Sequence, residues 1–155
     1  MTFRITGLDP APFRPLFDLT DDALAAQGIV RCTAPEDSGW PCRVSLRDAT
    51  PGETLLLLSY PHQPALSPYR ASGPVFVRQA AETRFDATGI LPPVAPPRLL
   101  SVRAYDSRDH IEDAEVVDGQ HLTAEINRMF TSPAVRYLHV HYARRGCFAF
   151  RVDRA

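Results

Sequence analysis

The clearest pattern in the chain is the alternation of apolar and polar residues over short segments. Residues 99–106 alternate most regularly. Leu100, Val102 and Ala104 are apolar there, and the residues between them are polar. An alternation of period two predicts a strand with one face in the core. The other segments with a strand pattern are 3–8, 29–33, 42–46, 54–59, 75–79, 111–117, 137–143 and 147–152.

One segment has helical periodicity instead. Residues 120–130 carry apolar side chains at positions i, i+4, i+7 and i+8, which is one face of a helix. Two short N-terminal helices are also predicted, one starting at Asp9-Pro10 and one capped by Thr20. We therefore expect an α+β fold with a mostly antiparallel, curved or partly closed sheet and one main helix. The length of 155 residues indicates a single domain over residues 1–155.

The final hairpin allows a prediction about which residues share a face. A three-residue loop at 144–146 would pair His139 with Arg151 and keep Phe148 on the apolar side. Gly146 would supply the left-handed residue that such a loop needs. The residues that then project from the opposite face are His139, His141, Cys147 and Arg151. That face is either solvated or part of a pocket.

A proline-rich segment could cover this polar face. Residues 60–74 contain four prolines, which break the period of any regular element. We expect an irregular loop there, because long loops in compact domains are often functional.

Composition narrows the classes of function. The chain has 17 basic residues, all arginine, and its net charge of −1 gives no general attraction to nucleic acid or to an anionic membrane. Without lysine, Schiff-base chemistry and a P-loop are excluded. No apolar run approaches the roughly 20 residues that span a bilayer. Three cysteines without a CxxC pair, and no apolar signal segment, predict a cytoplasmic protein.

The pair His139-x-His141 raises the hypothesis of a metal site. Alternate residues of a strand lie on one side, so the two imidazoles could share one ion. His62, Cys147 or Cys42 could add a third ligand, and zinc suits nitrogen and sulfur ligands. No acidic residue flanks the histidines to orient them, as second-shell partners of a metal site often do.

A second hypothesis is catalysis by a cysteine and a histidine. Cys147 is the candidate nucleophile, because a nearby arginine or imidazolium would favour its thiolate. His139 and His141 are the candidate general acids or bases. Cys42 alternates with apolar residues and is predicted to lie in the core.

The hypothesis that we favour at this stage is a pocket for a small anionic molecule. Arginine forks bind carboxylates and phosphates, and tyrosine hydroxyls can orient them. The candidate ligand-binding residues are Tyr60, His62, Tyr69, Arg70, Arg103, Tyr105 and Arg151. Whether the protein is an enzyme stays open, and the sequence indicates neither a cofactor nor an oligomeric state. The alternative is a non-enzymatic protein-interaction module built on the proline-rich loops and exposed aromatic residues.

Several segments together resemble a known family. They are Phe3-Arg-Ile-x-Gly-Leu-Asp9, Pro41-Cys-Arg-Val-Ser-Leu46, Pro68-Tyr-Arg-Ala-Ser-Gly-Pro-Val-Phe-Val-Arg78, Leu100-Ser-Val-Arg-Ala-Tyr-Asp106 and His139-Val-His-x4-Gly-Cys147. With these segments the chain is similar to the bacterial domain-of-unknown-function family 1203 (DUF1203). The resemblance implies a small, stand-alone bacterial protein and carries over no activity and no catalytic residue.

Overall fold

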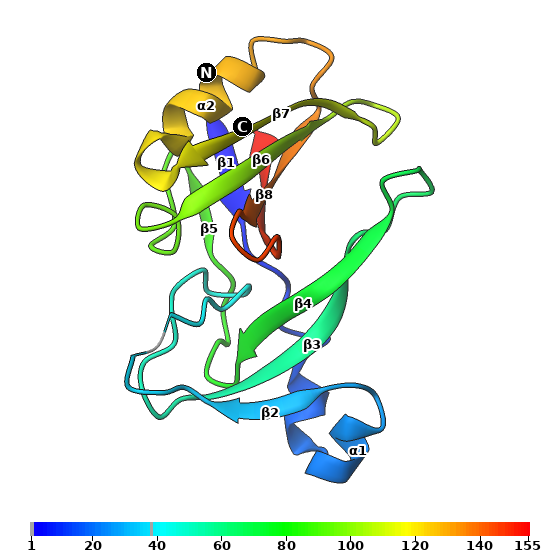
Figure 1. The fold of residues 1–155 in the computed structure, drawn as a ribbon, viewed down its shortest axis with the longest axis vertical. Coiled ribbons are helices and arrows are strands. Elements are labelled where there is room, and N and C mark those ends of the chain that lie inside the picture. Colours follow the sequence, from blue (N-terminus) through cyan, green and yellow to red (C-terminus); the bar gives the residue numbers. More distant parts are fainter. Residues whose placement is uncertain (1, 38) are drawn as a thin grey trace.

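The computed structural model describes residues 2–37 and 39–155, which form two antiparallel sheets (Figure 1). The larger sheet has the strand order β5-β1-β9-β8-β6-β7 and the smaller one β2-β3-β4. The strands of the larger sheet are β1 (Phe3–Thr6), β5 (Asp86–Thr88), β6 (Leu99–Tyr105), β7 (Ile111–Asp118), β8 (Tyr137–Tyr142) and β9 (Phe148–Arg154). Those of the smaller sheet are β2 (Val30–Thr33), β3 (Thr54–Gln63) and β4 (Ala71–Arg78). The prediction of mostly antiparallel sheets with one main helix is confirmed.

The sheets are open, so the prediction of a partly closed sheet is wrong. In the described part of the chain β5 and β7 are the two edges of the larger sheet and do not pair with each other. Closing a sheet requires its edge strands to meet in register. The short β5, with only three residues, was not predicted from the sequence.

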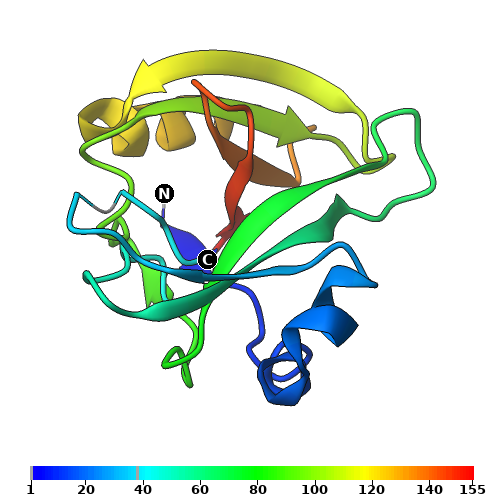
Figure 2. The ribbon, with the colours of Figure 1, turned by 60° about the horizontal axis from the view of Figure 1, so that its bottom comes forward.

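The helical segments flank the two sheets. They are η1 (Arg14–Asp18), α1 (Asp21–Ala25), η2 (Gly119–His121) and α2 (Leu122–Met129). The main helix predicted at 120–130 corresponds to η2 followed by α2. This helix buries Leu122, Ile126 and Met129 against one face of the larger sheet (Figures 1 and 2). In the part of the chain described, no helix is both long and apolar enough to cross a membrane.

Two of the three apolar cores of the described chain lie on different sheets. One core joins α2 to the larger sheet and includes Leu138, Val140 and Phe150. The other packs the N-terminal segment and α1 on the smaller sheet, around Leu56 and Val75. The face of the larger sheet that does not contact α2 is therefore turned toward the smaller sheet, and the polar residues of β8 project into the space between them.

The final hairpin keeps the predicted pairing only in part. His139 lies opposite Arg151, as predicted, and Gly146 has the expected left-handed backbone (φ 77°). A register shift next to Val140 leaves Ala149 as a β-bulge, so His141 pairs with Phe148 instead of Ala149. The bulge moves Phe148 to the histidine face, which corrects the prediction that it lies on the apolar side.

The segment 60–74 is more regular than predicted. β3 continues to Gln63 and β4 begins at Ala71, so only residues 64–70 form a loop. Pro61 lies at a register shift, where the ladder of backbone hydrogen bonds is already interrupted. Pro74 lies on β4, the edge strand, which has a free side for a residue without an N–H. Prolines at an edge or a bulge are compatible with strands, and this explains the error.

Residues 42–46 form a turn and not a regular strand. Only isolated bridges join Pro41 to Asp48 and Cys42 to Phe76. Leu46 has a left-handed backbone (φ 50°), which ends any extended conformation. Cys42 is buried in the core, as the sequence predicted.

Candidate functional site

Three histidines meet between the two sheets. His139 and His141 come from β8 and His62 comes from β3, with ring centroids 5.1 to 6.4 Å apart. Phe148 contacts all three rings, at centroid distances of 5.2 to 5.7 Å. His139 and His141 are almost completely buried, with 3% and 1% of their surface exposed, and His62 is partly exposed. We call His62, His139, His141 and Phe148 the histidine cluster.

Burial keeps the histidine cluster neutral at neutral pH. Desolvation is the main cause that lowers the pKa of His139 to about 3 and that of His141 to about 4. The neighbouring imidazoles and the positive charge of Arg103 lower both pKa values further. The pKa of His62 is lowered as well, mainly by its partial burial. The two β8 rings are therefore weak bases, which disfavours the general acid–base role that the sequence suggested for them.

The tautomer of His141 is set by the backbone. Its Nδ1 lies 2.9 Å from the carbonyl oxygen of Gly146, which can only accept a hydrogen bond, so Nδ1 carries the proton. Nε2 of His141 and Nδ1 of His62 and His139 are buried without a hydrogen-bond partner among the described residues. Free imidazole nitrogens could bind a metal. In residues 2–37 and 39–155, however, no three His, Cys, Asp or Glu side chains are grouped to hold a metal ion, and zinc binding stays a prediction.

The predicted arginines and tyrosine of this face surround the cluster. β6 places Arg103 opposite His139, and β9 places Arg151 opposite it on the other side. The Tyr105 ring lies 5.0 Å from that of His139. Arg151 donates hydrogen bonds to both carboxylate oxygens of Asp153, at 2.7 to 3.0 Å, so an acidic neighbour already balances its charge.

A small pocket of about 340 Å³ opens beside the histidine cluster. The predicted site residues that line it are Tyr60, His62, His139 and Arg151. Asp9 and Arg84 lie at the same pocket, so its lining carries both signs of charge. Tyr69 and Arg70 lie away from it, in the loop between β3 and β4, where Tyr69 packs against Tyr105. The predicted residues thus do not all converge on one cavity.

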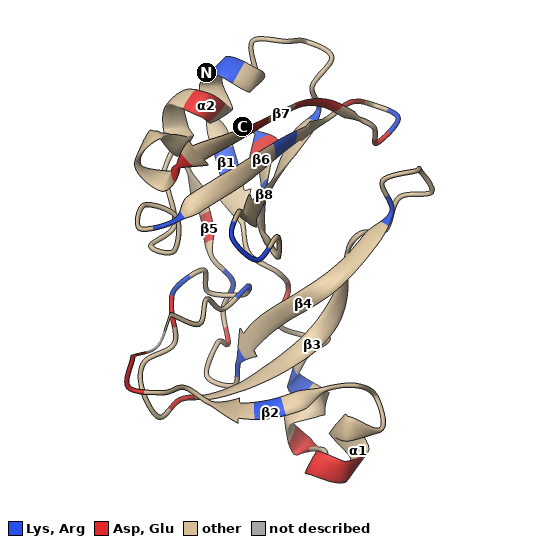
Figure 3. Cartoon of the chain, viewed as in Figure 1, with Lys and Arg blue, Asp and Glu red and all other residues tan. Residues whose placement is uncertain are grey.

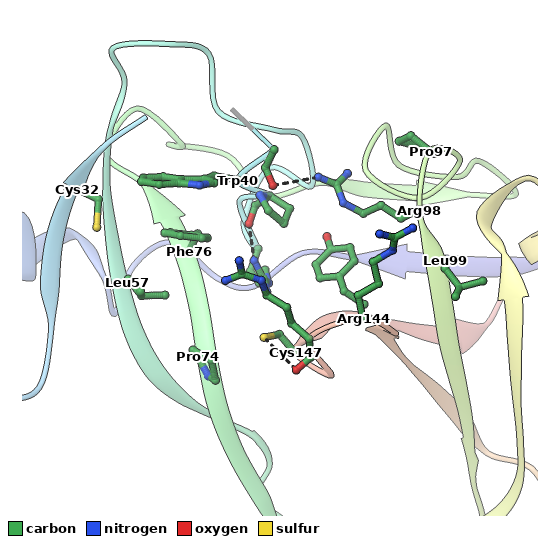
Figure 4. A pocket seen from close by; sticks show the side chains of 15 residues that line it. Cys32, Trp40, Leu57, Pro74, Phe76, Pro97, Arg98, Leu99, Arg144 and Cys147 are labelled. Atoms are coloured by element: carbon green, nitrogen blue, oxygen red, sulfur yellow. Dashed lines mark hydrogen bonds between the residues drawn. The ribbon is translucent and has the colours of Figure 1, made fainter. Parts of the chain in front are cut away.

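A larger cavity of about 770 Å³ lies between the two sheets, and we call it the inter-sheet cleft (Figure 4). One wall comes from the smaller sheet and from the segment before residue 43. The other comes from the start of β6 and from the β8–β9 hairpin. Its main lining side chains are Cys32, Trp40, Arg43, Leu57, Phe76, Arg98, Tyr142, Arg144, Arg145 and Cys147. Of the predicted site residues, only Cys147 is among them.

Arg43 is the buried cation of the inter-sheet cleft, with 3% of its surface exposed. Its Nε donates a hydrogen bond to the Phe148 carbonyl oxygen at 2.7 Å, and its Nη1 donates to that of Pro41 at 2.6 Å. No described carboxylate forms an ion pair with it, and its Nη2 has no hydrogen-bond partner in the described chain. Burial accordingly lowers the pKa of this guanidinium. Two neutral carbonyls hold the side chain in place but leave its charge uncompensated.

Tyr142 lies between two guanidinium groups. The Arg43 and Arg98 carbons lie 4.9 and 5.2 Å from its ring centroid. Its hydroxyl is buried without a hydrogen-bond partner among the described residues, and burial raises the Tyr142 pKa to about 12. Arg98 differs from Arg43 because it forms an ion pair with Asp48 at 2.6 Å. The unbalanced cation of the cleft, Arg43, therefore lies beside a buried tyrosine.

The β8–β9 loop adds two more cations. Arg144 and Arg145 are exposed and line the cleft, and neither forms an ion pair within the described residues. Figure 3 shows this basic loop facing the smaller sheet. Cys147 follows on the same loop, and within the described residues its thiol makes one weak hydrogen bond, to the Arg145 carbonyl at 3.9 Å. Four arginines and the single carboxylate of Asp48 leave the cleft with a net positive charge.

Comparison with known proteins identifies the family. The model of the family "Protein of unknown function (DUF1203)" matches residues 39–154 of the 155-residue chain. The chain belongs to the DUF1203 family. No curated protein and no solved structure matches it. The residues matched to DUF1203 include the whole lining of the inter-sheet cleft except Cys32.

Little in the sequence indicated the basic residues at the cleft of this DUF1203 protein. Arg43 lies between apolar positions of the alternating segment 42–46. Arg98 follows a run of prolines, and Tyr142 shares the apolar positions of its segment with Leu138 and Val140. The adjacent pair Arg144-Arg145 directly precedes Gly146-Cys147 and was the one usable signal, because it places two cations close to the candidate nucleophile.

Proposed function

We propose that the protein binds a small anionic molecule in the inter-sheet cleft. The observation that carries the proposal is Arg43, a buried guanidinium with no carboxylate partner in the described chain. A buried charge without a partner is costly, and an anion in the cleft would compensate it. Its Nη2, which has no hydrogen-bond partner in the described chain, is a donor that a phosphate or carboxylate could accept from.

The exposed loop arginines support the same function. Arg144 and Arg145 stand at the cleft without ion-pair partners among the described residues, so their field is available to attract an anion. Arg98 is balanced by Asp48 and contributes less. The smaller pocket is a weaker candidate because Asp153 balances its Arg151 and Asp9 lines it.

A protein-interaction module has less support. The large exposed apolar side chains of the described chain are spread over several segments, with only Leu66 and Tyr69 on the same loop, and a docking surface needs a contiguous patch. These side chains are Val30, Leu66, Tyr69, Ile90, Leu99 and Val116.

Thermal-shift and calorimetric titrations with inorganic phosphate, sulfate and citrate test the proposal. At least one of these anions should raise the melting temperature of the wild-type protein. The double substitution Arg144→Gln/Arg145→Gln should weaken that binding at least tenfold, because it removes two unpaired cations at the surface. Arg136→Gln is the matched control, since Arg136 is exposed but lies outside the cleft. If no anion binds, or if the double variant binds as tightly as wild type, the proposal is wrong.

A further inference from the structure

The two walls of the inter-sheet cleft differ in chemistry. The wall from the smaller sheet is apolar and consists mainly of Trp40, Leu57, Pro74 and Phe76 (Figure 4). The facing wall carries Arg98, Arg144, Arg145 and Tyr142, and the side chain of Arg43 reaches toward it from beside β4 to the carbonyl of Phe148. An inorganic anion would contact only the second wall. A ligand that uses both walls must combine an anionic group with an apolar body.

The size of the cleft also favours an organic ligand over an inorganic anion. Its volume of about 770 Å³ falls within the range of roughly 300–1,000 Å³ that is usual for sites of organic ligands. Phosphate or sulfate would fill a small part of this space and leave the apolar wall in contact with water. Covering that wall is favourable, because it removes apolar surface from water.

The apolar wall contains two flat side chains. The rings of Trp40 and Phe76 stack with centroids 4.8 Å apart and planes inclined by only 10°. Both side chains are partly exposed and line the cleft. Aromatic side chains favour aromatic partners in offset or edge-to-face contact, and guanidinium groups also stack on flat rings.

Resting on the proposed function, we infer that the ligand of the inter-sheet cleft is an aromatic phosphate or carboxylate. Its anionic group binds at Arg43, and its ring lies against Trp40 and Phe76. The exposed Arg144 and Arg145 attract the anion and contact its outer side.

Trp40 gives a direct test, because it is the only tryptophan in the protein. Its fluorescence reports ligands that reach the apolar wall. Phenyl phosphate, inorganic phosphate and phenol are titrated into wild type by calorimetry and by Trp40 fluorescence. Phenyl phosphate should bind at least tenfold more tightly than inorganic phosphate and should change the fluorescence, and phenol should bind more weakly than phenyl phosphate.

Substitutions separate the two halves of the ligand. Phe76→Leu and Trp40→Leu should each weaken phenyl phosphate several-fold and leave the affinity for inorganic phosphate unchanged. If these variants do not fold, nuclear Overhauser effects between the phenyl protons and the Trp40 indole of wild type replace them. The absence of such effects in the bound complex would contradict the inference.

The outcomes distinguish this inference from the proposed function. Equal affinity for phenyl phosphate and inorganic phosphate overturns the aromatic ligand and leaves anion binding standing. If phenol binds as tightly as phenyl phosphate, the anionic group contributes nothing and both proposals are wrong. If none of the three binds, the proposed function has failed together with the inference.

Discussion

The histidine cluster predicts how the stability of the protein depends on pH. His139 and His141 are buried, and their pKa values of about 3 and about 4 lie below the value of about 6.5 for an imidazole in the unfolded chain. Between pH 4 and pH 6.5 the folded protein therefore binds fewer protons than the unfolded chain. Stability is fully present above pH 6.5 and is lost as the pH falls through this window.

The magnitude follows from the number of protons. Each proton taken up on unfolding changes the free energy of unfolding by about 1.4 kcal/mol per pH unit, so two histidines give roughly twice that slope. Integrated from pH 7 to pH 5, the two rings account for a loss of roughly 3 to 4 kcal/mol. Typical domains have only about 5–15 kcal/mol of stability, so the effect is large. Measurements above pH 5 also separate the effect of the histidines from that of carboxylates, which titrate near pH 4.

Urea unfolding at pH 5, 6, 7 and 8 measures this dependence. His121→Gln serves as the control, because His121 is exposed and lies outside the cluster, and it should keep the slope of wild type. His141→Gln should reduce the slope by about one proton. NMR titration of the imidazole protons of wild type gives a second measurement that needs no variant. A stability that is flat between pH 5 and 7, or buried rings that titrate near pH 6.5, would refute the reasoning.

Three further predictions concern single residues. Gly7→Ala should lower the free energy of unfolding by at least about 2 kcal/mol, because the added Cβ would overlap the carbonyl of Val44. Gly39→Ala is the control: its Cβ would meet no atom, so urea unfolding should show a stability close to that of wild type. Glu53→Gln should lower the free energy of unfolding by about 3 kcal/mol, because it leaves the buried guanidinium of Arg78 without its ion pair. A loss below about 1 kcal/mol would contradict this prediction. Cys147 should react with the anionic reagent iodoacetate more readily, relative to neutral iodoacetamide, than the cysteine of a free peptide does, because the neighbouring cations attract the charged reagent. Mass spectrometry should find the ratio of the two alkylation rates several-fold above that of the peptide. An equal ratio would count against a basic cleft.

Period-two alternation predicted the parts of the fold in which one strand face is buried. In β6 and β8 the apolar residues face α2, so the sequence could place Arg103, His139 and His141 on the opposite face. Local patterns were sufficient there, because the face of a strand depends only on the parity of the residue number.

The features that the sequence could not predict depend on contacts between distant segments. Arg43 is buried because the carbonyl of Phe148, 105 residues away, accepts a hydrogen bond from it, and no local pattern records such a contact. The bulge at Ala149 reversed the side of Phe148, because one extra residue changes the parity. The cleft itself is formed by two separate sheets, whose approach is not encoded within any single segment.

The open edge of the larger sheet affects how copies of the protein meet. β7 ends the sheet with eight residues whose outer side has no partner strand in the described chain, and an edge of this length could extend into another copy. Glu112 and Glu115 are exposed on it, and acidic residues follow the strand (Figure 3). Two such edges would bring like charges together, and the repulsion disfavours their pairing. At 1 M salt the Debye length falls to about 3 Å and the repulsion is screened. We therefore expect self-association through β7 to increase with ionic strength.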